Sequence, residues 1–176
     1  MEKITILRIG HRLGRDERLS THCGLASRAL GAEEIIYSGE EDKKLLESIN
    51  SINEKWGSDF VARYEKNFRK VIDDYKAKKY LIVHLTMYGL PIEKNIAKIR
   101  KSKKVMVIIG SEKVPGEVYQ KADMNIAVTN QPHSELAALT IFLHEYFEGK
   151  ELAKRFNGKI KIIPQERGKK LVGNSQ

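Results

Sequence analysis

The sequence has only one cysteine, Cys23, among 176 residues. One thiol forms neither an intramolecular disulfide nor a cysteine-built zinc site, so we expect a reducing compartment and a small, buried Cys23 side chain. No run approaches the roughly 20 apolar residues that cross a bilayer, and residues 1–10 lead into a strand pattern instead of a signal peptide. These absences predict a cytoplasmic protein with no membrane association.

Common nucleotide-binding signatures are also missing. There is no G-x-G-x-x-G after a strand and no G-x-x-x-x-G-K-[ST], which argues against a Rossmann dehydrogenase and a P-loop enzyme. The five histidines do not have metal-ligand spacing. His133 and His144 could share a helix, but a rise of 1.5 Å per residue would separate them by about 16 Å. We therefore expect no metal site.

Positive charge is in excess. Lys and Arg number 32 against 23 Asp and Glu, which gives a formal net charge of +9. This excess favours a polyanionic partner, because basic side chains neutralise phosphates and release counterions. RNA, DNA and an acidic membrane would all satisfy it, and a heat-adapted surface is similarly rich in charge. Charge alone does not select the partner.

Short apolar, β-branched runs alternate with helical patterns. The runs lie at residues 3–9, 33–38, 79–87, 103–110 and 124–129. Apolar residues recur three or four apart over residues 40–56, which predicts a helix with Trp56 in the core. Ser38 and Glu41 suit a capping box at its start. The alternation predicts an α/β fold with a mostly parallel sheet flanked by helices.

Ligands of such folds bind beyond the carboxyl ends of the strands, so the turns after residues 87, 110 and 129 are candidate sites. Gly110 ends an apolar strand and would let a ligand approach the backbone, although an ordinary tight turn has the same sequence. From Thr129 to Glu135, six hydrogen-bonding side chains separate a strand from an apolar helix, whereas an N-cap needs only one. This concentration predicts a site for a polar ligand.

Three ordered motifs resemble those of the SPOUT class of RNA methyltransferases. In this chain, the first motif is matched by RLGRDERLSTHCGLASRALGA and the second by IIGSEKV followed by KADMNIAV. The third is matched by TNQPHSELAALTIFLHEY. With IVHLTMYGLP between the first and the second, the resemblance covers most of residues 4–150. The pattern closely matches the archaeal tRNA cytidine-56 2′-O-methyltransferases.

The resemblance implies a sheet whose C-terminal part forms a trefoil knot, with S-adenosylmethionine bound in the knot largely through backbone groups. It also implies a homodimer. The positions that match the cofactor site are Leu85, Gly110, Ser111, Glu112, Lys113, Val114, Val128, Thr129, Asn130, Gln131, Pro132, His133, Ser134 and Glu135.

The resemblance also places an essential arginine in the first motif. Methyl transfer to a hydroxyl needs an oriented oxygen, removal of its proton and a cation beside the developing alkoxide. We expect Arg18 to be that cation, Arg12 and Arg15 to bind RNA phosphate, and His22 to be an easier general base than arginine. The alternatives are a solvated basic loop for the arginines and an ordinary helix surface position for His22.

The predicted function is methylation of the ribose 2′-hydroxyl of cytidine 56 in the tRNA T loop, with S-adenosylmethionine as donor. Residues 1–150 would form the methyltransferase domain, and residues 151–176 a basic C-terminal extension that contacts RNA or a second subunit. Two alternatives are a SPOUT enzyme that methylates an RNA base and a noncatalytic RNA-binding protein.

Overall fold

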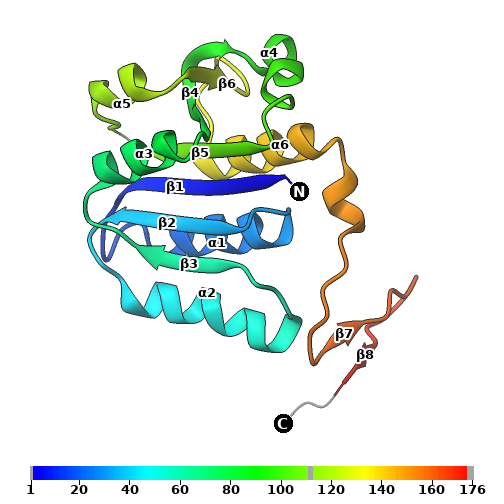
Figure 1. The fold of residues 1–176 in the computed structure, drawn as a ribbon. Helices are drawn as coiled ribbons and strands as arrows, with labels where there is room; N and C mark the ends of the chain where they lie inside the picture. The colour runs from blue at the N-terminus through cyan, green and yellow to red at the C-terminus, as the bar shows by residue number, and fades with distance from the viewer. Residues whose placement is uncertain (1, 111–112, 174–176) are drawn as a thin grey trace.

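The computed structural model describes residues 2–110 and 113–173, and its main body is a parallel sheet between helices (Figure 1). Six strands pair in the order β3-β2-β1-β5-β4-β6, each parallel to its neighbours. The strands are β1 Lys3–His11, β2 Glu34–Gly39, β3 Val61–Tyr64, β4 Leu81–Pro91, β5 Lys104–Gly110 and β6 Met124–Ala127. The α/β fold with a parallel sheet is therefore confirmed.

Six α-helices and one short 3-10 helix connect or follow these strands. They are α1 Glu17–Ala29, α2 Lys43–Trp56, α3 Phe68–Ala77, α4 Ile92–Ile99, α5 Gly116–Lys121, α6 Glu135–Phe147 and η1 Lys150–Ala153. Two further short strands, β7 Lys161–Ile162 and β8 Leu171–Val172, form an antiparallel pair near the C-terminus. No described helix is both long enough and apolar enough to cross a membrane.

Each face of the sheet has its own apolar core. Along β1, Ile4 and Ile6 belong to a cluster with side chains of α1, α2, α4 and α6, whereas Leu7 and Ile9 pack with α3 and α5. This alternation is what a strand buried on both faces produces. Cys23 of α1 is fully buried in the first cluster, as expected from the sequence.

All five predicted strands are present, but the sequence reading missed β3. This edge strand has four residues, VARY, and Arg63 interrupts them, so it has no continuous apolar run; Val61 is 46% exposed. Trp56 was wrongly expected in the core: it is the last residue of α2 and is only partly buried.

The predicted capping box at the start of α2 was also wrong. Asp42 is the N-cap, and its carboxylate accepts a hydrogen bond from the Leu45 backbone N–H at 3.0 Å. Ser38 instead lies in β2 and donates to the Lys66 carbonyl oxygen. A nearer acidic side chain satisfies the helix start, because the chain has left the strand before the helix begins.

The C-terminal segment runs from α6 along the outside of the molecule to the far end of α2 (Figure 1). The Arg28 guanidinium lies 4.7 Å from the ring centre of Phe156, and the Ile160 N–H donates to the Lys55 carbonyl oxygen. The segment therefore packs on the helical layer before β7 and β8. The domain boundary at residue 150 and the trefoil knot both stay predictions.

Candidate active site

A cavity of about 410 Å³ opens at the carboxyl edge of the sheet, where the turns after β4, β5 and β6 meet. The loop between β1 and α1 completes its wall. Of the positions predicted from the sequence, those that line it are Arg12, Arg15, Leu85, Gly110, Val114, Val128, His133, Ser134 and Glu135. The prediction that these turns lie together is confirmed.

The remaining predicted positions lie beside the cavity or elsewhere. Lys113 lines a neighbouring cavity together with Arg12 and Arg15. Residues 129–132 belong to the same turn as His133 without lining the cavity wall. Ser111 and Glu112 lie outside the described residues.

The carboxyl end of β4 loops outward and forms one rim of the cavity. Leu85 and Leu90 both pair with Ile126 of β6, so residues 86–89 bulge away from the ladder. Gly89 lies so close to β6 that an added Cβ would be 2.5 Å from the Ile126 backbone nitrogen. A glycine is therefore required for this close backbone contact.

Asn130 joins the turn after β6 to this bulge. Its side-chain amide donates to the Met87 carbonyl at 2.6 Å and to the Gly89 carbonyl at 3.1 Å. The same turn ends at Ser134, whose hydroxyl oxygen accepts from the Ala137 N–H and so caps α6. Asn130 and Ser134 thus fix the two ends of the turn, and His133 and Ser134 at its second end line the cavity.

A buried ion pair lies under the cavity. Arg8 of β1 is fully buried, and its Nη2 donates to Glu135 Oε1 at 2.6 Å, while the Glu135 side chain is 9% exposed. Burial raises the pKa of Glu135, and the charge of Arg8 opposes that rise without cancelling it. Nε and Nη1 of Arg8 and Oε2 of Glu135 have no hydrogen-bond partner within the described part of the chain.

Arg8 was not predicted as part of the site, although the sequence carried a signal. A charged residue in the middle of the apolar run KITILRI must be paired when the strand is buried. Its partner is 127 positions away along the chain, which no local pattern indicates.

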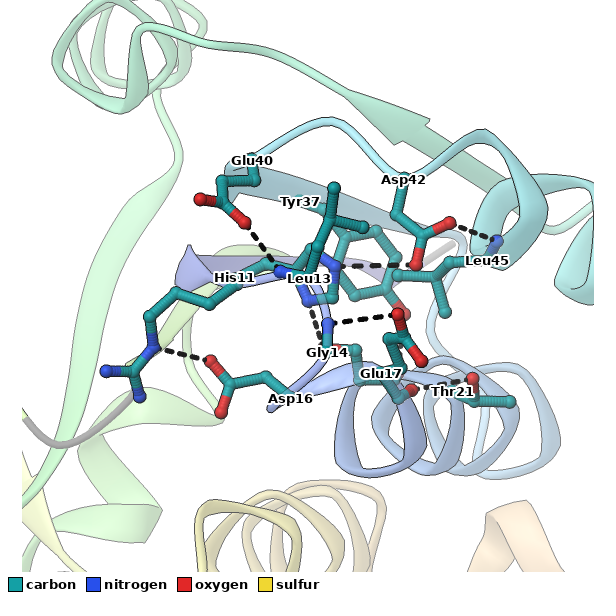
Figure 2. Close-up of polar contacts among 12 residues, drawn as sticks. His11, Leu13, Gly14, Asp16, Glu17, Thr21, Tyr37, Glu40, Asp42 and Leu45 are labelled. Carbon is teal, nitrogen blue, oxygen red and sulfur yellow. Dashed lines mark hydrogen bonds and ion pairs between the residues drawn. The ribbon is translucent and has the colours of Figure 1, made fainter.

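The β1–α1 loop is held at several points (Figure 2). Glu40 accepts from the Leu13 N–H at 2.6 Å, and Glu17 accepts from the Gly14 N–H at 3.0 Å. Arg12 Nε donates to Asp16 at 3.0 Å. Burial alone would raise the pKa of Asp16, but the hydrogen bond from Arg12 and the charges of Arg12, Arg8 and Arg15 together lower it. The loop therefore presents its arginines from a fixed backbone.

His11 anchors the base of this loop. Its Nδ1 lies 2.7 Å from the Ser20 hydroxyl oxygen of α1, and its Nε2 lies 3.6 Å from Asp42, the N-cap of α2 (Figure 2). Burial is the main cause of the lowered pKa of His11, and the nearby Arg8 charge adds to it. A neutral imidazole thus bonds the end of β1 to α1, while its Nε2, on the side of Asp42, has no hydrogen-bond partner among the described residues.

Arg18 and His22 are exposed on α1, one helical turn apart, and neither lines the cavity of its own chain. Eight lining residues were not predicted from the sequence, and they are Asp16, Leu19, His84, Thr86, Met87, Tyr88, Tyr119 and Ala138. The described residues contain no group of three or more His, Cys, Asp or Glu side chains arranged to hold a metal ion.

Comparisons with known proteins agree with this geometry. The profile of the family described as "tRNA ribose 2′-O-methyltransferase, aTrm56" matches residues 56–172. The tRNA (cytidine(56)-2′-O)-methyltransferase of Pyrococcus horikoshii is 49% identical over 174 residues, which cover 96% of this chain and 84% of that protein.

Two solved structures share the fold at low identity. The A. aeolicus TrmH/SpoU tRNA modifying enzyme has a TM-score of 0.63 at 18% identity, covering 86% of this chain and 77% of that one. The SpoU methyltransferase AviRb from Streptomyces viridochromogenes, in complex with the cofactor AdoMet, has a TM-score of 0.63 at 16% identity, covering 85% and 59%.

The parallel sheet, the cavity at its carboxyl edge and these likenesses define a methyltransferase fold of the SpoU/TrmH class, which is the SPOUT fold expected from the three motifs. Within that class, the chain belongs to the tRNA ribose 2′-O-methyltransferase family.

Proposed function

We propose that this protein transfers a methyl group from S-adenosylmethionine to the ribose 2′-hydroxyl of cytidine 56 in the tRNA T loop. The observation that carries the proposal is the single cavity in which three strand-end turns meet a loop bearing Arg12 and Arg15. The name of the Pyrococcus relative supports this nucleotide, and the net charge of +9 suits a tRNA partner. We assign the reaction to the cytoplasm.

The cavity suits S-adenosylmethionine in size and in wall chemistry. Its volume of about 410 Å³ is that of an ordinary small-molecule site. An added Cβ at Gly110 would lie 2.1 Å from a methyl group of Val114, so glycine keeps this wall clear. When bound, the cofactor would supply an electrophilic methyl carbon. The residues proposed to hold it are Leu85, Gly110, Val114, Val128, His133, Ser134 and Glu135.

The other matched positions have supporting roles in this proposal. Asn130 fixes the turn around the cofactor through its bonds to the β4 bulge. Lys113, with Arg12 and Arg15, borders the neighbouring cavity, where three cations would attract RNA phosphates. The tRNA backbone would then approach from the side of the β1–α1 loop.

The proposed chemistry of Arg18 and His22 requires a second copy of the chain. Both side chains are exposed on α1, and neither lines the cavity of its own chain. A homodimer would let them reach the cavity of the partner, where the Arg18 guanidinium stabilises the negative charge that develops on the 2′-oxygen and His22 accepts its proton. Closed twofold dimers are the commonest homo-oligomers.

The main experiment is methylation of an unmodified tRNA transcript by the purified protein, followed by nuclease digestion and mass spectrometry. We expect one methyl group on the ribose of cytidine 56, because a 2′-O-methyl group blocks cleavage at the neighbouring phosphodiester. A methylated base with an unmodified ribose would reject the ribose assignment. Binding of tRNA without any binding of S-adenosylmethionine would reject the assignment of the protein as a methyltransferase.

Arg18→Ala should lower the rate of methyl transfer at least about 100-fold, since it removes a cation that acts on the transition state. Cofactor affinity, measured by calorimetry, should stay within about twofold, because Arg18 does not line the cavity. Wild-type activity of the variant would remove Arg18 from its assigned role.

Mixing two inactive variants tests the dimer. Arg18→Ala retains an intact cavity, and Gly110→Leu blocks the cavity while it retains Arg18. If Arg18 serves the partner, the mixture should recover about a quarter of wild-type activity, because half of the dimers are mixed and each has one working site. A mixture that stays inactive, although the subunits exchange, would place Arg18 outside the partner's site.

A further inference from the structure

His84 lies at the carboxyl end of β4 and lines the cavity while being only 1% exposed. Its Nδ1 lies 2.9 Å from Asn125 Oδ1 on the neighbouring strand β6. Its Nε2 is buried and has no hydrogen-bond partner in residues 2–110 and 113–173. Buried polar atoms in proteins nearly always have a partner, so this nitrogen requires an explanation.

The neighbouring amide determines which nitrogen of His84 carries the proton. Asn125 Nδ2 donates to the Tyr119 carbonyl oxygen at 2.9 Å, so Asn125 Oδ1 must be the atom that faces His84. An amide oxygen only accepts hydrogen bonds, so His84 Nδ1 donates and Nε2 keeps its lone pair. Burial lowers the pKa of His84, which keeps the imidazole neutral. Nε2 is therefore an acceptor without a donor.

The side of the cavity around His84 is uncharged. The Tyr119 ring packs edge-on against the imidazole at 4.7 Å, and the Tyr119 hydroxyl lies 3.1 Å from Thr86 Oγ1. The acidic and basic side chains of the lining come instead from the β1–α1 loop and the start of α6: Arg12, Arg15, Asp16 and Glu135. Because β5 lies between β1 and β4, the backbones of these two strands are about 10 Å apart.

We propose that His84 recognises the adenosine part of S-adenosylmethionine by accepting, at Nε2, a hydrogen bond from one of its N–H or O–H groups. This inference rests on the proposed function. The charges of the cofactor, an ammonium, a carboxylate and a sulfonium, all belong to its methionine part. Its adenosine part is uncharged and has donors at the 6-amino group and the ribose hydroxyls. An uncharged wall with a free acceptor fits adenosine.

Calorimetry with S-adenosylhomocysteine tests the contact. His84→Leu removes the acceptor, and His144→Gln is the matched control, because His144 lies on α6 outside the cavity and contacts Glu151. We expect affinity about tenfold weaker for His84→Leu and unchanged for the control, which is the size of one lost neutral hydrogen bond. Equal affinity for wild type and His84→Leu would overturn the inference.

Ligand analogues identify the donor without a mutation. The 6-dimethylamino, 2′-deoxy and 3′-deoxy forms of S-adenosylhomocysteine each remove one candidate donor. The analogue that lacks the bonded donor should bind wild type about tenfold more weakly and should no longer distinguish wild type from His84→Leu. If all three analogues still distinguish the two proteins as the parent ligand does, His84 does not accept from adenosine.

Nitrogen NMR of the wild-type imidazole gives a readout that a purely structural role would not change. We expect a proton on Nδ1 and none on Nε2, with the Nε2 resonance moving when S-adenosylhomocysteine binds. A proton on Nε2, or an unmoved resonance in the bound protein, would contradict the inference. Failure of wild type to bind both the cofactor and S-adenosylhomocysteine would instead defeat the proposed function, and the two failures are thus distinguishable.

Discussion

Among single residues, Arg8 and Glu135 form the ion pair beneath the cavity. Arg8 is fully buried, the Glu135 side chain is 9% exposed, and their charged atoms lie 2.6 Å apart. The pair joins β1 to the first turn of α6, so it sets where the Glu135 carboxylate sits at the cavity wall. A carboxylate in the first turn of α6 also interacts favourably with the positive N-terminal end of the helix.

Arg8→Met should lower the free energy of unfolding by about 3 kcal/mol, because it leaves a buried carboxylate without its partner. Adding Glu135→Leu should recover much of that loss, since the double variant buries no charge. Urea denaturation of wild type, both single variants and the double variant gives the coupling energy. Additive losses in the double variant would show that the two side chains do not stabilise each other.

At the scale of structural elements, the bulge of β4 and the turn after β6 form one unit. Gly89 touches the β6 backbone, and Asn130 bonds the carbonyl oxygens of the bulge. The rim of the cavity therefore depends on a backbone contact between two strands and not on side-chain packing alone. A change in that contact should affect stability and cofactor binding together.

Gly89→Ala tests this unit. Its Cβ would lie 2.5 to 2.6 Å from backbone atoms of Ile126 and Asn125, so the two strands must separate. We expect a loss of about 1–3 kcal/mol in unfolding free energy and weaker binding of S-adenosylmethionine by calorimetry. Gly116→Ala is the control, because nothing lies within 4 Å of its added Cβ. Equal effects of the two substitutions would contradict the role of Gly89.

At the scale of the whole molecule, two buried neutral histidines should make folding sensitive to acid. Burial lowers the pKa of His11 and of His84 from the ordinary 6.5. Below pH 6.5 the unfolded chain therefore binds protons at these histidines that the folded protein does not bind. The contribution of the two histidines to the free energy of unfolding is fully present above pH 6.5. It is lost as the pH falls toward the lowered pKa of each group.

Denaturant titrations between pH 7.5 and pH 5.5 measure this dependence. The free energy of unfolding should fall toward the acid end, by up to about 1.4 kcal/mol per pH unit for each histidine. His84→Leu should have a shallower slope than wild type, because one of the two protons is no longer involved. A variant with the wild-type slope would mean that His84 is protonated alike in the folded and unfolded states.

The sequence pattern was enough to predict the class of fold, five of the six strands of the main sheet and the turns that form the cavity. Buried parallel strands are apolar on both faces, so their pattern is visible along the chain, and the ends of parallel strands meet at one edge of the sheet. The order of the three motifs in the sequence also predicted the family. β3 was not predicted because Arg63 interrupts its four residues and Val61 is exposed, so no apolar run is visible.

The partners of the polar groups became visible only in the folded structure. Arg8 and Glu135 are 127 positions apart, and His84 meets Asn125 across a strand pair. The structure also put Arg18 on an exposed helix face, outside the cavity of its own chain. Hydrophobic periodicity depends on neighbours along the chain, whereas a hydrogen bond depends on atoms that folding brings within about 3 Å.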